Sequence, residues 1–137
     1  MQPTVKLALL CDYAITAQDG KLSIMGIWSN INLPSLPNAW PRFFVVIVLV
    51  LDRGDYDVGL GFVDPLGQQV LPEPVGEELN VDTPGAETNL VIEFNNLLFS
   101  RPGIHQVQLF LDRRLIHSIP LNLQVTSMEG FTPIQAS

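Results

Sequence analysis

A run of nine apolar residues in the middle of the chain constrains the fold more than any other feature. It lies within RFFVVIVLVLD, residues 42–52, between an arginine and an aspartate. The run is far shorter than the ~20 residues that a membrane helix needs. Its β-branched and aromatic residues favour a strand. A strand on the surface of a two-layer protein needs only one apolar face, so something must cover the second face of this one.

Alternation along the strand divides the run into two faces. Odd-numbered residues can fill a core, and Phe44, Val46, Val48 and Val50 then point outward. Removing these four side chains from water is worth roughly 6–12 kcal/mol, against an association cost of ~4–15 kcal/mol. A bare apolar strand would also promote aggregation. Two covers remain open, a second subunit or a loop of the same chain at residues 72–88, and we expect the subunit interface, with a homodimer favoured.

Composition places limits on the partners and on the compartment. The 137 residues suit one domain, residues 1–137, with a loosely ordered tail over 127–137. A formal net charge of −7 argues against binding nucleic acid, because few basic groups are available to contact phosphates. Cys11 is the only cysteine, so no disulfide can form within the chain. The first residues lack the pattern of a signal peptide, and we expect a cytoplasmic protein with no membrane partner.

Turn residues recur about every ten positions and separate short apolar runs, which is typical of an all-β protein. We expect about eight strands in a single antiparallel β-sandwich. The expected strands are residues 4–13, 22–33, 42–52, 58–64 and 88–99, one or two edge strands within 68–87, and a hairpin over 103–125.

Three local predictions follow from the patterns within these strands. Residues 22–33 are apolar on both faces and should be central. The apolar positions change parity near Asn95 and Asn96, which predicts a bulge. An odd-length loop at residues 112–114 would place His117 opposite Leu109 in the last hairpin.

The opening LALLCDYAITAQDGKLSIMGIWSNI and the closing PGIHQVQLFLDRRLIHSIPLNLQV resemble a family of uncharacterised bacterial proteins of about this size. The resemblance spans most of the chain and implies an immunoglobulin-like sandwich of unknown function. It includes no catalytic motif and implies no site residues. The chain departs from the family pattern at Cys11, where alanine is usual, and at Arg113, where glycine is usual.

Candidate catalytic residues are few. The only histidines, His105 and His117, share the apolar face of the last hairpin and have no evident acidic partner. Cys11 lies among apolar residues, the setting of an inert buried thiol. No nucleotide-binding, hydrolase or metalloprotease motif is present. We therefore expect a non-enzymatic interaction or structural module without a cofactor.

An alternative is a ligand-binding module that uses loops at one end of the sandwich. Asp52, Asp55 and Asp57 supply oxygen atoms of the kind that calcium prefers, although Arg53 lies among them and their spacing matches no fixed calcium loop. Trp40, in a proline-rich connection, can serve as an anchor for a ligand or protein partner, or as a plug that closes the sandwich. Calcium and a small molecule are both open as the ligand.

Overall fold

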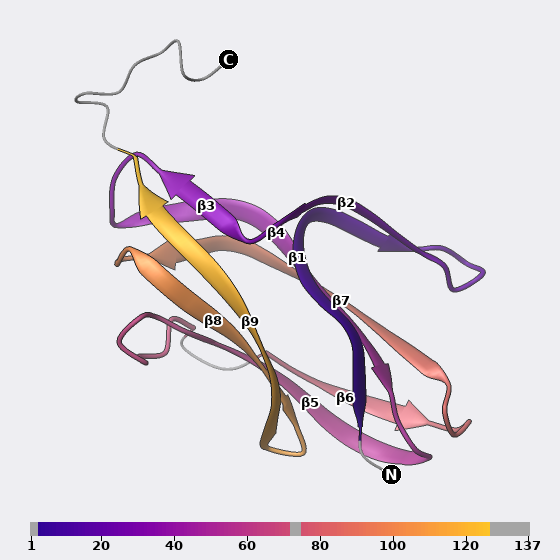
Figure 1. Ribbon diagram of the computed structural model, residues 1–137. Helices are drawn as coiled ribbons and strands as arrows, with labels where there is room; N and C mark the ends of the chain where they lie inside the picture. Colours follow the sequence, from indigo (N-terminus) through magenta and orange to yellow (C-terminus); the bar gives the residue numbers. More distant parts are fainter. Residues whose placement is uncertain (1–2, 72–74, 127–137) are drawn as a thin grey trace.

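The computed structural model describes residues 3–71 and 75–126, which form two β-sheets (Figure 1). One sheet has the strand order β2-β1-β4-β7, and the other has the order β3-β9-β8-β5-β6. The strands are β1 (Thr4–Thr16), β2 (Leu22–Trp28), β3 (Asn30–Leu33), β4 (Asn38–Val50), β5 (Gly54–Val63), β6 (Val75–Val81), β7 (Glu87–Phe99), β8 (Gly103–Leu111) and β9 (Arg114–Val125).

The all-β prediction is confirmed, with nine strands in the described residues rather than about eight. All pairs of neighbouring strands are antiparallel except β3 and β9, which run parallel. No helix in this part of the chain is long and apolar enough to cross a membrane. The predicted tail at residues 127–137 lies outside the described residues.

Residues 22–33 do not form one central strand, so that prediction is wrong. The chain breaks at Ser29, and the two halves join different sheets as the edge strands β2 and β3. The segment is apolar on both faces because β3 contributes to the main core and β2 to a second cluster. Ile31 and Leu33 of β3 are buried in the main core, whereas Ile24 of β2 packs against a second cluster on the far side of the first sheet.

The main core lies between the sheets and uses the inner face of β4. Phe43, Val45, Ile47 and Leu49 are fully buried there. The ring of Phe43 stacks on Phe94 of β7 at 5.2 Å between centroids and meets Phe62 of β5 edge-on. Aromatic pairs of this kind add to the stabilisation from buried area, so β4, β5 and β7 are joined through their rings.

The outer face of β4 is covered by the chain itself. Phe44, Val46 and Val48 are 6%, 0% and 4% exposed, and Val50 is half-buried. Phe44 and Val46 form a second buried cluster with Cys11 and Ala14. The partly buried side chains packed on this cluster are Leu7, Leu9, Leu22, Ile24 and Val91.

The hairpin of β1 and β2 provides much of this cover. Ala14, Leu22 and Ile24 all come from it, and at its tip the carbonyl of Gly20 accepts a hydrogen bond from the Asn89 side chain of β7 at 3.2 Å. Because β7 lies on the far side of β4 from β1, this bond shows that the hairpin folds across the outer face of β4. The predicted covering loop, residues 72–88, contributes no side chain to the cluster among its described residues 75–88.

Both β4 and β7 change the face that they turn to the core, at the same level. In β4, even-numbered Trp40 packs against the core before Pro41, whereas odd-numbered Phe43 does so after it. Their partners in β7, Leu97 and Phe94, show the same change of parity. Asn96, opposite Pro41, has a φ of 53°. The register stays continuous through this point, so the predicted change of face is correct, but it arises from a paired irregularity rather than from a bulge.

The last hairpin has the predicted register, with Leu109 opposite His117. Its turn differs from the prediction. Only Asp112 and Arg113 lie outside the strands, both with positive φ, as a tight two-residue turn requires. A register shift between Leu109 and Phe110 supplies the extra residue that keeps the apolar positions on one side.

We predict that Val46→Lys destabilises the folded protein by several kcal/mol, because it places an unpaired charge in a side-chain position with no exposure. Chemical denaturation followed by tryptophan fluorescence measures the loss. Leu66→Lys, at a site that is 64% exposed, is the control and should change stability by no more than about 0.5 kcal/mol. A Val46→Lys protein of unchanged stability would contradict the burial of the outer face of β4.

Candidate functional site

Two surface features are candidates for a functional site, because each presents exposed side chains on paired strands. One is an open trough on the outer side of the second sheet, along β5 and β6. The other is the exposed apolar side of the β1–β2 hairpin. They lie on opposite sides of the two-sheet fold, because the hairpin covers the outer side of the first sheet.

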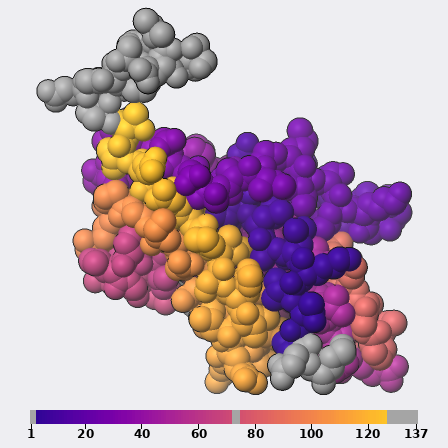
Figure 2. All heavy atoms as spheres, viewed as in Figure 1, coloured from indigo at the N-terminus to yellow at the C-terminus, as the bar shows by residue number. Residues whose placement is uncertain are grey.

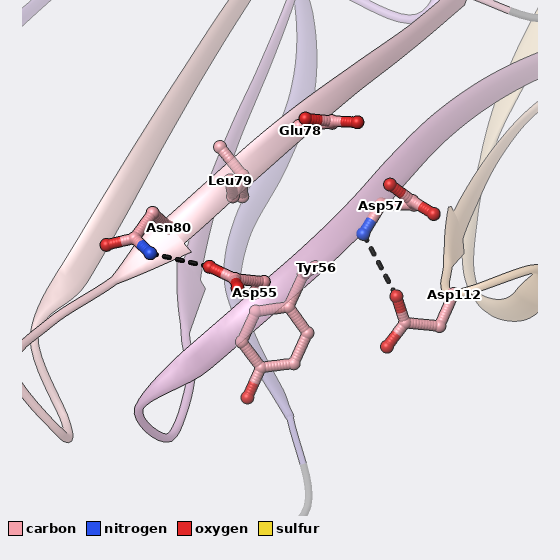
Figure 3. Close-up of a pocket in the computed structure, with 7 residues that line it drawn as sticks. All are labelled: Asp55, Tyr56, Asp57, Glu78, Leu79, Asn80 and Asp112. Carbon is pink, nitrogen blue, oxygen red and sulfur yellow. Dashed lines mark hydrogen bonds between the residues drawn. The ribbon is translucent and has the colours of Figure 1, made fainter.

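The acidic part of the trough is an open hollow of about 570 Å³. Antiparallel pairing places Asp55 of β5 opposite Asn80 of β6, and Asp57 opposite Glu78. Asp112, on the β8–β9 turn, completes the acidic lining (Figure 3). Alternation along the strands therefore brings four carboxylates to one surface from three separate segments.

Hydrogen bonds fix some of these groups. Asn80 Nδ2 donates to Asp55 Oδ1 at 2.5 Å, and Asp112 Oδ1 accepts from the backbone N–H of Asp57 at 2.9 Å (Figure 3). The hydroxyl of Tyr56 donates to the Asp52 carbonyl at 2.9 Å and ties the β4–β5 turn to β5. The trough is therefore built on paired strands rather than on a free loop.

The geometry does not support the calcium interpretation of Asp52, Asp55 and Asp57. Asp55 and Asp57 lie within β5, and Asp52 lies in the turn before it. Among residues 3–71 and 75–126, no group of three or more histidine, cysteine, aspartate or glutamate side chains could hold a metal ion. Trp40 lies near the start of β4 and these aspartates follow its end, so no single end-loop site contains both.

Trp40 is half-buried and packs at the edge of the main core. Its ring lies 6.0 Å from that of Trp28, and Trp28 in turn meets Phe43 at 5.5 Å. Of the two roles open from the sequence, this position favours the plug that closes the sandwich.

An apolar depression of about 380 Å³ continues the trough from Asp57. It is lined by Val58, Gly59, Gly76, Phe110 and Arg113 in addition to Asp57. Gly59 and Gly76 face each other across β5 and β6. The sequence patterns did not predict this depression. The two glycines at Gly59 and Gly61, unusual inside a strand, were the available signal.

The β1–β2 hairpin presents four large exposed apolar side chains. Tyr13 pairs with Met25, Ile15 lies two residues nearer the tip opposite Ser23, and Ile27 lies two residues farther from the tip opposite Cys11. These four side chains, which we call the hairpin face, are 40% (Tyr13), 49% (Ile15), 64% (Met25) and 65% (Ile27) exposed. Figure 2 shows the hairpin in indigo and violet, projecting from the side of the molecule.

Gly26 shapes the hairpin in the middle of β2. It has a φ of 69°, and a Cβ at this position would collide with the carboxylate of Asp12. Only glycine meets both conditions without strain. The local bend of β2 therefore depends on this residue.

His105 and Cys11 are placed in apolar surroundings, whereas His117 is half-buried. His105 is 1% exposed, lies edge-on to Phe99, and its Nδ1 hydrogen-bonds to the carbonyl of Gly103 at 3.2 Å. Burial lowers the pKa of His105, and the bond to Gly103 and the charge of Asp64 oppose this shift. Burial also raises the pKa of the Cys11 thiol, which keeps it protonated and unreactive at neutral pH.

The depressed pKa of His105 predicts a pH-dependent loss of stability. An unfolded histidine titrates near ~6.5, so the unfolded chain takes up a proton before the folded protein does as the pH falls. The melting temperature should therefore decrease as the pH drops through about 6.5, and this decrease should be smaller in His105→Gln. Calorimetry between pH 7.5 and pH 5.5 measures both proteins. Equal slopes would contradict the assignment.

Comparison with solved structures finds similar folds in parts of larger proteins. A β-glucosidase from Listeria innocua matches with a TM-score of 0.50 and 12% identity, over 92% of this chain and 16% of that one. The alkylpurine DNA glycosylase AlkC from Pseudomonas fluorescens matches with a TM-score of 0.42 and 13% identity, over 85% of this chain and 30% of that one. The chain spans less than a third of either protein, and such likenesses concern the fold alone.

No curated protein sequence matches the chain significantly. A family of unknown function, DUF6941, matches residues 6–124. This range covers both sheets from β1 to almost the end of β9. The chain belongs to the DUF6941 family.

Proposed function

We propose that this protein is a non-enzymatic interaction module that self-associates through the hairpin face and the free edge of β2. The observation that carries the proposal is the exposure of four large apolar side chains on one hairpin at the edge of a sheet. This location replaces the outer face of β4, which the chain itself buries.

The edge of β2 favours a second copy as the occupant. Among the described strands, β2 pairs only with β1, so its other side presents unpaired backbone donors and acceptors. A two-fold axis beside β2 would pair the two edges antiparallel and extend each sheet into its partner's. Both copies then contribute the same surface, and each β2 edge pairs the backbone groups of the other, as in an isologous interface.

The residue types on the hairpin face and the distribution of carboxylates also favour it as the interface. Interface cores are enriched in tyrosine, methionine and arginine and depleted in carboxylates. The hairpin face has Tyr13 and Met25, and the Arg42 guanidinium lies 5.6 Å from the Tyr13 ring centroid. The acidic trough lies on the other side of the sandwich. Association through the hairpin therefore keeps these carboxylates of two acidic chains apart.

The expected affinity is modest. Full burial of a large apolar side chain is worth ~1.5–3 kcal/mol, and these four are about half exposed, so they contribute roughly 3–6 kcal/mol. Association costs an estimated ~4–15 kcal/mol. The side chains alone do not offset this cost, and the edge-strand hydrogen bonds must supply the rest. The dimer should therefore depend on concentration.

A non-enzymatic role and a cytoplasmic location are parts of this proposal. Both are supported by Cys11, the only cysteine in the sequence, which is a free, buried thiol with a raised pKa. Such a thiol is a poor nucleophile, and it suits a reducing compartment.

We also infer that the sandwich is of the immunoglobulin-like type. In that fold strands B and E are neighbours in one sheet, and C, F and G are neighbours in the other. The strand order supports the inference, because β4 lies beside β7, and β5, β8 and β9 are adjacent. Strand β6 beside β5 corresponds to the extra strand of variable-type domains. β1, which pairs antiparallel with β4, corresponds to strand A, and the edge strand β2 has no counterpart.

We predict that the double variant Met25→Glu, Ile27→Glu is a folded monomer at concentrations where the unmodified protein forms dimers, because facing copies would oppose four added carboxylates. Size-exclusion chromatography with light scattering over a hundredfold concentration range measures this. The matched control is Leu66→Glu, Leu115→Glu, which changes two exposed leucines elsewhere and should still dimerise. A dimer that persists in the hairpin variant, or an unmodified protein that is monomeric throughout, would contradict the proposal.

A further inference from the structure

The glycine pair in the trough has no evident role in the fold. Gly59 and Gly76 do not have positive φ values. A Cβ built on Gly59 would lie 3.8 Å from Phe110 Cβ, and one built on Gly76 would lie 3.8 Å from the Val58 carbonyl oxygen. Both distances are ordinary contacts, so alanine would fit at either position. Glycine inside a strand is nevertheless destabilising relative to alanine.

What the two glycines provide is open space beside an aromatic ring. Phe110 lies next to Gly59 on β8, and its Cε2 atom would be 3.4 Å from a Cβ on Gly61. Because Gly59 and Gly61 have no side chains, the Phe110 ring can lie along β5. Without the glycine pair, the apolar depression of about 380 Å³ would be partly filled.

The charged side chains beside this depression determine which kind of ligand it can bind. Asp57 lines both the depression and the adjoining acidic hollow, which also contains Asp55, Glu78 and Asp112. Among the residues that the structure describes, Arg113 is the one basic side chain that lines the depression. Four carboxylates against one guanidinium exclude an anionic ligand and favour a cationic one. The net charge of −7 adds long-range attraction for the same kind of partner.

The spacing suits a long basic side chain. One side-chain repeat along a strand spans about 6.5–7 Å, which is the separation of the Gly59–Gly76 pair from the Asp57–Glu78 pair. The methylene stem of a lysine can therefore lie in the depression against Phe110 while its ammonium group reaches these carboxylates. A cation near the ring face gains further attraction.

We propose that the trough binds a lysine-rich peptide segment of a partner protein, with a lysine stem in the Gly59–Gly76 depression and its ammonium group at Asp57 and Glu78. This binding site is separate from the self-association proposed for the hairpin. Among the described strands β6 pairs only with β5, so an extended peptide can also pair with its other edge.

Titration calorimetry with an acetylated, amidated octalysine peptide tests the proposal. Gly76→Val fills the depression without changing the charge, and valine is well suited to a strand. We expect the affinity to fall at least tenfold in this variant while the melting temperature is maintained. If Gly76→Val does not fold, Gly76→Ala and Phe110→Leu provide the same test with smaller changes, each with an expected loss of at least threefold.

Charge variants separate this site from general attraction to an acidic protein. Asp57→Asn should weaken binding at least threefold more than Asp19→Asn, which removes the same charge from the tip of the hairpin. Arg113→Ala should strengthen binding, because it removes the competing cation. Unchanged binding in folded Gly76→Val or Gly76→Ala would overturn the proposal. So would equal effects of Asp57→Asn and Asp19→Asn, or binding of a neutral oligosaccharide but not of octalysine.

Discussion

The burial of β4 on both faces is the constraint on which the rest of this structure depends. Its inner face joins the aromatic core between the sheets, and its outer face would be an apolar strip if nothing covered it. The protein meets this requirement with the β1–β2 hairpin, which folds across the strip and is held at its tip by the bond between Gly20 and Asn89. The length of β1 and the bend at Gly26 are explained by this role.

A covering hairpin of two strands has its own outer side, which faces solvent. In this protein that side is apolar at the hairpin face, and it borders an edge of β2 that pairs with no other described strand. The hairpin thus buries the apolar face of β4 but exposes apolar side chains of its own. Self-association through the hairpin would complete the cover. The trough on the outer side of the second sheet is independent of this requirement, and an alanine Cβ would fit at Gly59 and at Gly76.

Local patterns predicted the parts of this fold that local rules determine. The β4 strand, its division into two faces and the register of Leu109 with His117 follow from a period of two and from turn chemistry. The cover of β4 did not follow, because periodicity shows that a face is apolar but not which distant segment packs on it. The change of sheet at Ser29 was missed for the same reason. The trough depends on pairing between β5 and β6, so only Asp55 and Asp57, named for a calcium site, were found in advance.

The most direct test of the central claim is thiol labelling of Cys11 over a hundredfold range of protein concentration. Cys11 is fully buried in the same cluster as Phe44 and Val46, on the outer face of the first sheet. If the chain itself covers β4, the thiol of the folded protein stays unreactive at every concentration. Rapid labelling in dilute folded protein that slows as the concentration rises would contradict this account and place the outer face of β4 at a subunit interface.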